Sequence, residues 1–222
     1  MRKMVETDKK KIENKITFFV TSLVSKNFNI IEPEFKKLKD DKYLNNPNWI
    51  FRKRSFAQGK VKKGKVFWID KTTFFQSKKI NKYAGGIQRK FPKMSLRLKN
   101  FSKKIILENL FNKKILQSDF NFGVHAIRII CNEHNKGFPV PEGFHTDGVN
   151  FVAIIPINQK NCAGGVSYLK TQKSQKIVLK NKIFNGKFLF FNDTKFLHYA
   201  TPIIHKKGNL GFRDIIVLTF LY

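Results

Sequence analysis

Cysteine is scarce in this sequence. Cys131 and Cys162 are the only two in 222 residues, and neither belongs to a Cys-x-x-Cys pair. Two isolated cysteines exclude a disulfide framework, and a reduced, intracellular setting is the simplest account of them.

Long hydrophobic runs are also missing. The longest apolar stretch near the start, "ITFFVTSLV", is too short to span a bilayer. It follows "ETDKKKIENK", which does not resemble the first part of a signal peptide. We therefore predict no membrane association and a cytoplasmic protein.

Acidic residues are few: the chain has 15 Asp and Glu against 44 Lys and Arg, and its formal net charge is +29. Such an excess of positive charge makes nucleic acid, an anionic surface or an anionic substrate candidate partners. However, the lysines are spread along the chain, in "KVKKGKV", "NFSKKII" and "IIHKKGN", and Lys, Asn, Ile and Phe are all abundant, as in proteins of A/T-biased genomes. The charge favours a solvated basic surface and does not by itself select a partner.

Apolar residues are numerous enough for one sizeable core, since 41% of the chain is hydrophobic and 24 residues are Phe. No internal repeat or low-complexity linker divides the chain, so we predict a single domain over residues 1–222. Apolar side chains recur at three- and four-residue steps over residues 8–25 and again over about 95–117, which predicts two helices. The first would lie in a helical extension covering residues 1–48.

The remaining chain has the pattern of strands. Short β-favouring stretches follow Trp49 ("NWIFRKRSF", "KVFWI", "TTFFQ"), and seven more follow residue 122 or so, separated by Gly, Asn, Asp or Lys turns. Short strands at regular spacing favour a sandwich or barrel. We therefore expect an α+β, mainly β protein: a jelly-roll core over residues 49–222, with the helix near 95–117 and the N-terminal helices packed outside.

One short motif has the residue types of a metal site. In "PEGFHTDGVNF", His145 and Asp147 are two residues apart, so in an extended segment both side chains face the same way. The same pattern also fits a polar turn before a strand. A facial iron site needs one more histidine; His198 in "NDTKFLHYATPI" is the best placed, ahead of His125, His134 and His205.

An arginine follows on a later apolar stretch, "GNLGFRDIIVLTF". Arg213 is costly to bury without an anionic partner, and its planar guanidinium suits a carboxylate. If it faces the barrel interior, Ile215, Val217 and Thr219 share its face. Such an arginine could hold a dicarboxylate whose other end chelates the metal.

This order of residues resembles the iron(II)/2-oxoglutarate dioxygenases of the double-stranded β-helix (jelly-roll or cupin-like) fold. The motifs "VHAIRI", "PVPEGFHTDGVNFV", "FFND....H..TPI", "G.RDIIVLTF" and "FFQSKKINKYAGGIQRKF" are similar to those of a bacterial branch that includes hydroxylases of free amino acids such as isoleucine. The resemblance runs from about Trp49 to the C-terminus. It implies that His145, Asp147 and His198 bind Fe(II) and that Arg213 pairs with the distal carboxylate of 2-oxoglutarate. It also implies hydroxylation of a C–H bond with O2, releasing succinate and CO2.

Other residues have two interpretations each. Arg128 in "HAIRII" could contact a carboxylate of substrate or cosubstrate, or be an edge-strand surface residue. Gln76, Asn81 and Arg89, with the Gly85–Gly86 pair, match the pattern in which this branch could bind substrate, or they form a structured turn. The branch often has an acidic residue after a second glycine pair, where this chain has Val166, so its substrate could differ.

Two enzyme functions and one binding function are compatible with these motifs. The first is a hydroxylase of a small molecule, most plausibly a free L-amino acid. The alternative is a nucleic-acid-modifying demethylase, suggested by the charge, although such enzymes carry a second arginine where this chain has Thr219. An inactive binding module is disfavoured because all four chemical positions are filled. Sulfoxidation or desaturation, the carbon attacked and the oligomeric state stay open.

Overall fold

The computed structural model of the chain describes residues 18–24, 27–44, 49–81, 85–116 and 119–222. Its strands are β1 (Phe18–Ser22), β2 (Lys39–Asp40), β3 (Arg52–Lys62), β4 (Lys65–Ile69), β5 (Thr73–Phe75), β6 (Gln88–Lys90), β7 (Phe120–Cys131), β8 (Phe151–Lys160), β9 (Cys162–Gly164), β10 (Ser167–Thr171), β11 (Ile177–Asn181), β12 (Lys187–Asn192), β13 (Phe196–Ala200), β14 (Ile203–His205) and β15 (Gly211–Leu221). Its helices are α2 (Glu32–Lys36), α3 (Leu96–Ile105) and the π-helix η1 (Ile106–Phe111).

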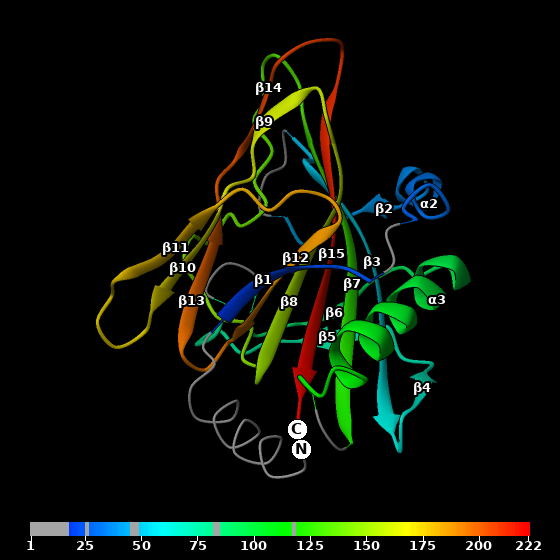
Figure 1. Cartoon of the computed structure of the whole chain (residues 1–222). Helices are drawn as coiled ribbons and strands as arrows, with labels where there is room; N and C mark the ends of the chain where they lie inside the picture. The colour runs from blue at the N-terminus through cyan, green and yellow to red at the C-terminus, as the bar shows by residue number, and fades with distance from the viewer. Residues whose placement is uncertain (1–17, 25–26, 45–48, 82–84, 117–118) are drawn as a thin grey trace.

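A large antiparallel sheet forms one wall of the molecule (Figure 1). Its strands lie in the order β1-β12-β8-β15-β7-β3-β2, and β4 pairs with β3. The central strand β15 pairs with β7 from Gly211 to Leu221 and with β8 from Phe212 to Phe220. A smaller sheet, β11-β10-β13, lies across from it, and two further pairs, β14-β9 and β5-β6, complete the strands. This arrangement is the mainly β, jelly-roll type of fold that the strand pattern predicts.

The two faces of the large sheet are buried against different partners. Even-numbered residues such as Val124 on β7 and Ile216 on β15 join the main hydrophobic core, which also contains Leu98 and Ile106 from the helices. The opposite face of the sheet packs on the small sheet, where Val152 and Leu169 belong to one cluster. Because side chains alternate along a strand, the odd-numbered residues of β7 and β15 face the space between the sheets.

The helix expected over residues 8–25 is wrong where the structure describes it. Phe18–Ser22 is a strand that pairs antiparallel with β12, and Phe19 stacks on Phe190 with ring centroids 5.2 Å apart. Residues 1–17 lie outside the described part. The aromatic and β-branched side chains of "FFVTS" suit a strand, and pairing with β12 decides the outcome over local periodicity. In the rest of the supposed helical extension, the described residues form one short helix, α2, and the strand β2.

The second expected helix is present but shorter than residues 95–117. Ser95 caps it, since its hydroxyl accepts a hydrogen bond from the Leu98 N–H at 3.4 Å. The helix widens into a π-helical turn from Ile106 and ends at Phe111. None of the helices in the described part is long and apolar enough to cross a membrane.

Candidate metal centre and active site

The loop before β8 and the strand β13 bring three candidate ligands together. His145 and Asp147 lie in the loop, and His198 lies in the middle of β13. The backbones of the two histidines bond to each other, with N–H···O distances of 3.1 and 2.9 Å, and their ring centroids are 4.1 Å apart. One ligand atom from each of the three side chains lies within 4.8 Å of the others.

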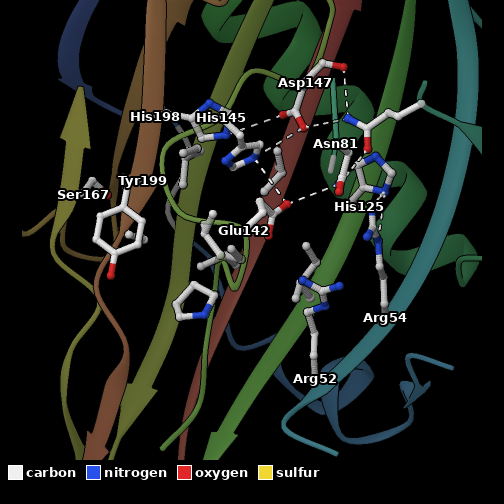
Figure 2. A pocket seen from close by; sticks show the side chains of 18 of the residues that line it. Arg52, Arg54, Asn81, His125, Glu142, His145, Asp147, Ser167, His198 and Tyr199 are labelled. Atoms are coloured by element: carbon white, nitrogen blue, oxygen red, sulfur yellow. Dashed lines mark hydrogen bonds and ion pairs between the residues drawn. The ribbon is translucent and has the colours of Figure 1, made fainter. Parts of the chain in front are cut away.

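Both imidazole rings present the same nitrogen to the aspartate, as Figure 2 shows. His145 Nε2 is 3.9 Å from Asp147 Oδ1, and His198 Nε2 is 3.7 Å from Asp147 Oδ2. Burial and the neighbouring His145 hold the pKa of His198 well below its ordinary value, so its ring is neutral, the form that binds a metal. Two imidazole nitrogens and one carboxylate on one side of a cavity fit a non-haem Fe(II) ion.

The cavity beside these ligands has an arginine in its wall. Arg213 on β15 is 2% exposed, and its Nη2 atom has no hydrogen-bond partner among the described residues. Burial lowers the pKa of this guanidinium to about 10, although the thiol of Cys162 opposes the shift. The hydroxyl of Ser167, which lines the same cavity, is also buried and unpaired within the described part. Unpaired buried donors are costly, so this wall fits a bound carboxylate.

Gly165 leaves room for that arginine. A Cβ atom built on this residue would lie 2.8 Å from Arg213 Cδ and 2.9 Å from its Nε. Its φ of +70° also falls in the left-handed region that glycine adopts without strain. The second glycine of "AGGVS" is therefore needed for the guanidinium to occupy its place.

Three residues of the "Q....N...GG..R" pattern reach the same cavity as the ligands. Gln76 donates from Nε2 to the carbonyl and the Oδ1 of Asp147, at 3.1 and 3.3 Å. Its own Oε1 accepts from Arg89 Nη2 at 2.6 Å and from Asn81 Nδ2 at 3.2 Å. All three side chains are buried and line the cavity, so they form a network attached to a candidate ligand.

The glycine pair of this pattern is hydrogen-bonded to earlier residues of the same segment. The Gly85 N–H donates to the carbonyl of Asn81 at 2.8 Å, and the Gly86 N–H donates to the carbonyl of Gln76, also at 2.8 Å. The two glycines therefore take part in backbone hydrogen bonds, and the segment also supplies cavity side chains. Val166 does not line the cavity; its backbone N–H instead donates to the Thr201 hydroxyl at 3.0 Å.

Arg128 does not reach the cavity. Its guanidinium donates two hydrogen bonds to the Asp214 carboxylate, both at 2.7 Å, and lies over the ring of Phe212 at 4.2 Å from its centroid. The residue lies on the face of β7 opposite to His125 and Ile127, which line the cavity. Because β7 is an inner strand of the sheet, Arg128 is not an edge-strand surface residue either.

Several cavity residues lie outside the motifs that the sequence offers. Arg54 and His125 are buried side by side, and the His125 Nδ1 atom is 2.8 Å from Arg54 Nη2. Arg52 pairs with the buried Asp41, with Nε 2.8 Å from Oδ2. The alternation of "FRKRSF" was a possible signal, because it puts two arginines on one face of a strand.

Glu142 is the other cavity residue that the motifs did not indicate. Its Oε1 accepts from Asn81 Nδ2 at 3.3 Å and lies 3.8 Å from His145 Nε2. Its Oε2 is buried and has no partner among the described residues. Figure 2 shows Asn81 and His125 on one side of the cavity, Tyr199 and Ser167 on the other, and Glu142 between them.

Solved structures of similar fold are numerous. A bsmA homologue from Methylobium petroleophilum PM1 matches with a TM-score of 0.80 and 23% identity, over 97% of this chain and 92% of that one. IDO from Bacillus thuringiensis matches with a TM-score of 0.70 and 19% identity, over 98% and 95%. The Fe(II)/α-ketoglutarate-dependent dioxygenase TqaL matches with a TM-score of 0.67 and 13% identity, over 99% and 87%. At these identities the similarity shows a shared fold. No curated protein sequence matches the chain significantly.

A family model covers most of the sequence. The 2OG-Fe dioxygenase model matches residues 32–219, a range that contains the three candidate ligands and Arg213. Members of this family use Fe(II), 2-oxoglutarate and O2. With the His-Asp-His cluster in place, the match supports a 2-oxoglutarate-dependent dioxygenase activity. The chain belongs to the 2OG-Fe dioxygenase family.

Proposed function

We propose that this dioxygenase hydroxylates a free L-amino acid or a close derivative, with release of succinate and CO2. The observation that carries the proposal is the pair of opposite charges beside the candidate ligands: Glu142 and Arg89 line one cavity, and both have a buried polar atom without a partner in the described part. A free amino acid carries an ammonium and a carboxylate on one carbon. Such a substrate offers a donor to the unpaired Glu142 oxygen and an acceptor to the unpaired Arg89 N–H.

In this proposal His145, Asp147 and His198 hold Fe(II), and Arg213 binds the distal carboxylate of 2-oxoglutarate. The bound iron, with 2-oxoglutarate and O2, supplies the oxidation that puts one oxygen atom on the substrate. The protein orients the reactants: Gln76 holds the Asp147 carboxylate from one side at 3.3 Å, and the His198 ring, kept neutral by burial, has one nitrogen without a proton that can bind the metal. The Ser167 hydroxyl lies in the same cavity and is available to the cosubstrate.

The balance of charge supports an anionic group on the substrate. Arg52 and Arg54 share one carboxylate, that of Asp41, at 2.8 and 3.9 Å, whereas Arg89 donates to the neutral Gln76. Burial lowers the pKa of Arg54 to about 9, so it still carries its charge at neutral pH. Three buried cations with one carboxylate between them favour a carboxylate-bearing substrate.

The test is substrate-dependent succinate release. The protein is loaded anaerobically with Fe(II) and 2-oxoglutarate, exposed to O2, and offered free amino acids, the same amino acids blocked at the amine or the carboxylate, and methylated oligonucleotides. We expect release with a free amino acid, a product heavier by one oxygen atom, and loss of release with both blocked forms. Equal turnover of blocked forms would remove the amino-acid proposal.

Glu142→Gln sharpens this test. Removing the negative charge should raise KM for the amino acid by roughly 10-fold or more, because a charge-assisted hydrogen bond to the ammonium is lost. Slow succinate release without substrate should stay unchanged, which separates substrate binding from the iron and 2-oxoglutarate sites.

The nucleic-acid alternative rests on the net charge of +29. Thr219, where a demethylase would carry its second arginine, lines a neighbouring cavity and is not part of the wall around Arg213. Succinate release coupled to the methylated oligonucleotides, with none for amino acids, would replace the amino-acid proposal with this one.

A further inference from the structure

We infer that Asp193 is a positioning residue for the metal site, one that fixes both the Asp147 loop and the proton on the His198 ring. Asp193 lies in the turn after β12 and is 1% exposed. The inference rests on the proposed function, because it takes His145, Asp147 and His198 as the iron ligands. It assigns a role to a residue that does not itself line the cavity.

One oxygen of Asp193 holds the loop. Its Oδ2 accepts three backbone hydrogen bonds, from the N–H groups of Asp147, Gly148 and Val149, at 2.9, 2.8 and 3.2 Å. The Asp193 N–H in turn donates to the carbonyl of Asn150 at 3.0 Å. These bonds tie the loop that carries Asp147 to the end of β12, so the carboxylate ligand is held from behind.

The other oxygen faces a histidine ligand. Asp193 Oδ1 lies 3.6 Å from His198 Nδ1, and both atoms are buried without a hydrogen-bond partner in the described part of the chain. A carboxylate there favours the ring form with its proton on Nδ1. That form leaves the lone pair on Nε2, which is the nitrogen directed at Asp147.

His145 has a matching arrangement with a different acceptor. Its Nδ1 is 3.1 Å from the carbonyl oxygen of Gly143, and its Nε2 also faces Asp147. Both histidines therefore have an oxygen behind Nδ1 and the same nitrogen toward the candidate metal position. The oxygen behind His198 belongs to a carboxyl group, that of the residue that also anchors the loop of the third ligand.

Asp193→Asn separates this role from a purely structural one. The amide oxygen would keep the three backbone N–H groups, because an NH2 group cannot accept from them. The NH2 group would then face His198 Nδ1 and favour the ring form with its proton on Nε2, where the metal must bind. We expect a folded variant by circular dichroism, with Co(II) affinity lowered roughly 10–100-fold and an altered visible Co(II) spectrum.

Asp214→Asn is the matched control. Asp214 is an equally buried carboxylate with two charge-assisted hydrogen bonds to Arg128, outside the cavity. This variant should lose stability while its Co(II) affinity and spectrum stay those of the wild type. A general loss of stability therefore does not imitate the effect expected at Asp193.

The outcomes distinguish the inference from the proposed function. If the wild type binds no Co(II), the proposed iron site fails, and the inference fails with it. If the wild type binds Co(II) and folded Asp193→Asn binds it with the same affinity and spectrum, only the inference is overturned.

If Asp193→Asn does not fold, a measurement on the wild type can still test whether Nδ1 of His198 carries the proton. Nuclear magnetic resonance of the 15N-histidine-labelled wild type loaded with Zn(II) reports which ring nitrogen carries the proton. The His198 signals are identified by their loss in His198→Ala. A protonated Nδ1 supports the inference, whereas an unprotonated or metal-bound Nδ1 overturns it.

Discussion

His145 and His198 exchange backbone hydrogen bonds in both directions, 3.1 Å from His145 N to His198 O and 2.9 Å for the reverse. This bridge between a loop and a strand sets the spacing of the two imidazole rings without any metal. The candidate iron site is therefore built into the backbone pairing, and a side chain can be removed from it without removing the scaffold.

Replacing His198 with alanine should abolish metal binding and retain the fold, because its backbone bonds to His145 persist when the ring is lost. Metal titration by calorimetry and far-UV circular dichroism measure the two properties. His205→Ala is the control, since His205 lies on β14 and outside the ligand cluster. Wild-type dioxygenase activity in His198→Ala would remove this residue from the triad.

Replacing Arg213 with alanine should raise KM for 2-oxoglutarate by roughly 10–100-fold, because a buried charge-assisted pair with the distal carboxylate is lost. Metal affinity should not change, since the three ligands stay in place. Steady-state kinetics at varied 2-oxoglutarate concentration measure KM, and a parallel metal titration measures the metal affinity. An unchanged KM would place the cosubstrate carboxylate elsewhere.

Gly165→Ala should also change KM for 2-oxoglutarate, because Gly165 lies against the Arg213 side chain. The added methyl group would lie 2.8 Å from Arg213 Cδ, so the guanidinium must move and KM for 2-oxoglutarate should rise. Gly208→Ala is the matched control, because its φ of +71° imposes similar backbone strain while its nearest neighbour is Asn161 at 3.3 Å. If both variants change KM equally, strain and not displacement of Arg213 is the cause.

Arg128→Ala should destabilise the fold and leave KM for 2-oxoglutarate unchanged. Asp214 would stay fully buried without its cation, at a cost of about 3–5 kcal/mol in the free energy of unfolding. Burial already raises the pKa of Asp214 to about 6, against the hydrogen bonds from Arg128, so the variant raises it further.

The same variant should therefore be pH-dependent. A raised carboxyl pKa means that the folded state holds a proton which the unfolded state has released, so acidification toward pH 5 should reduce the loss of stability. Urea unfolding of the wild type and the variant at pH 5 and pH 8 measures this difference. An equal loss of stability at both pH values would contradict it.

The sequence by itself determined the features that depend only on neighbouring residues. The alternation in "HTD" put His145 and Asp147 on one side, and the β-favouring stretches after residue 122 became strands. The apolar setting of Arg213 indicated a buried cation, and the structure buries it to 2% exposure. Each of these depends on side-chain periodicity or on the cost of burying one group, both of which can be read from neighbouring residues.

Tertiary structure decided the outcomes that depend on distant partners. "FFVTS" is a strand because its backbone pairs with β12. Arg128 does not reach the cavity because its guanidinium binds Asp214 on the opposite face of the sheet. The approach of His198 to His145, and of Asp193 to both the loop and the ring, likewise comes from pairing between segments far apart in the chain. Local sequence patterns do not show which strands are neighbours in a sheet. The hydrogen bonds and ion pairs that select each strand's neighbour form only when the sheets assemble.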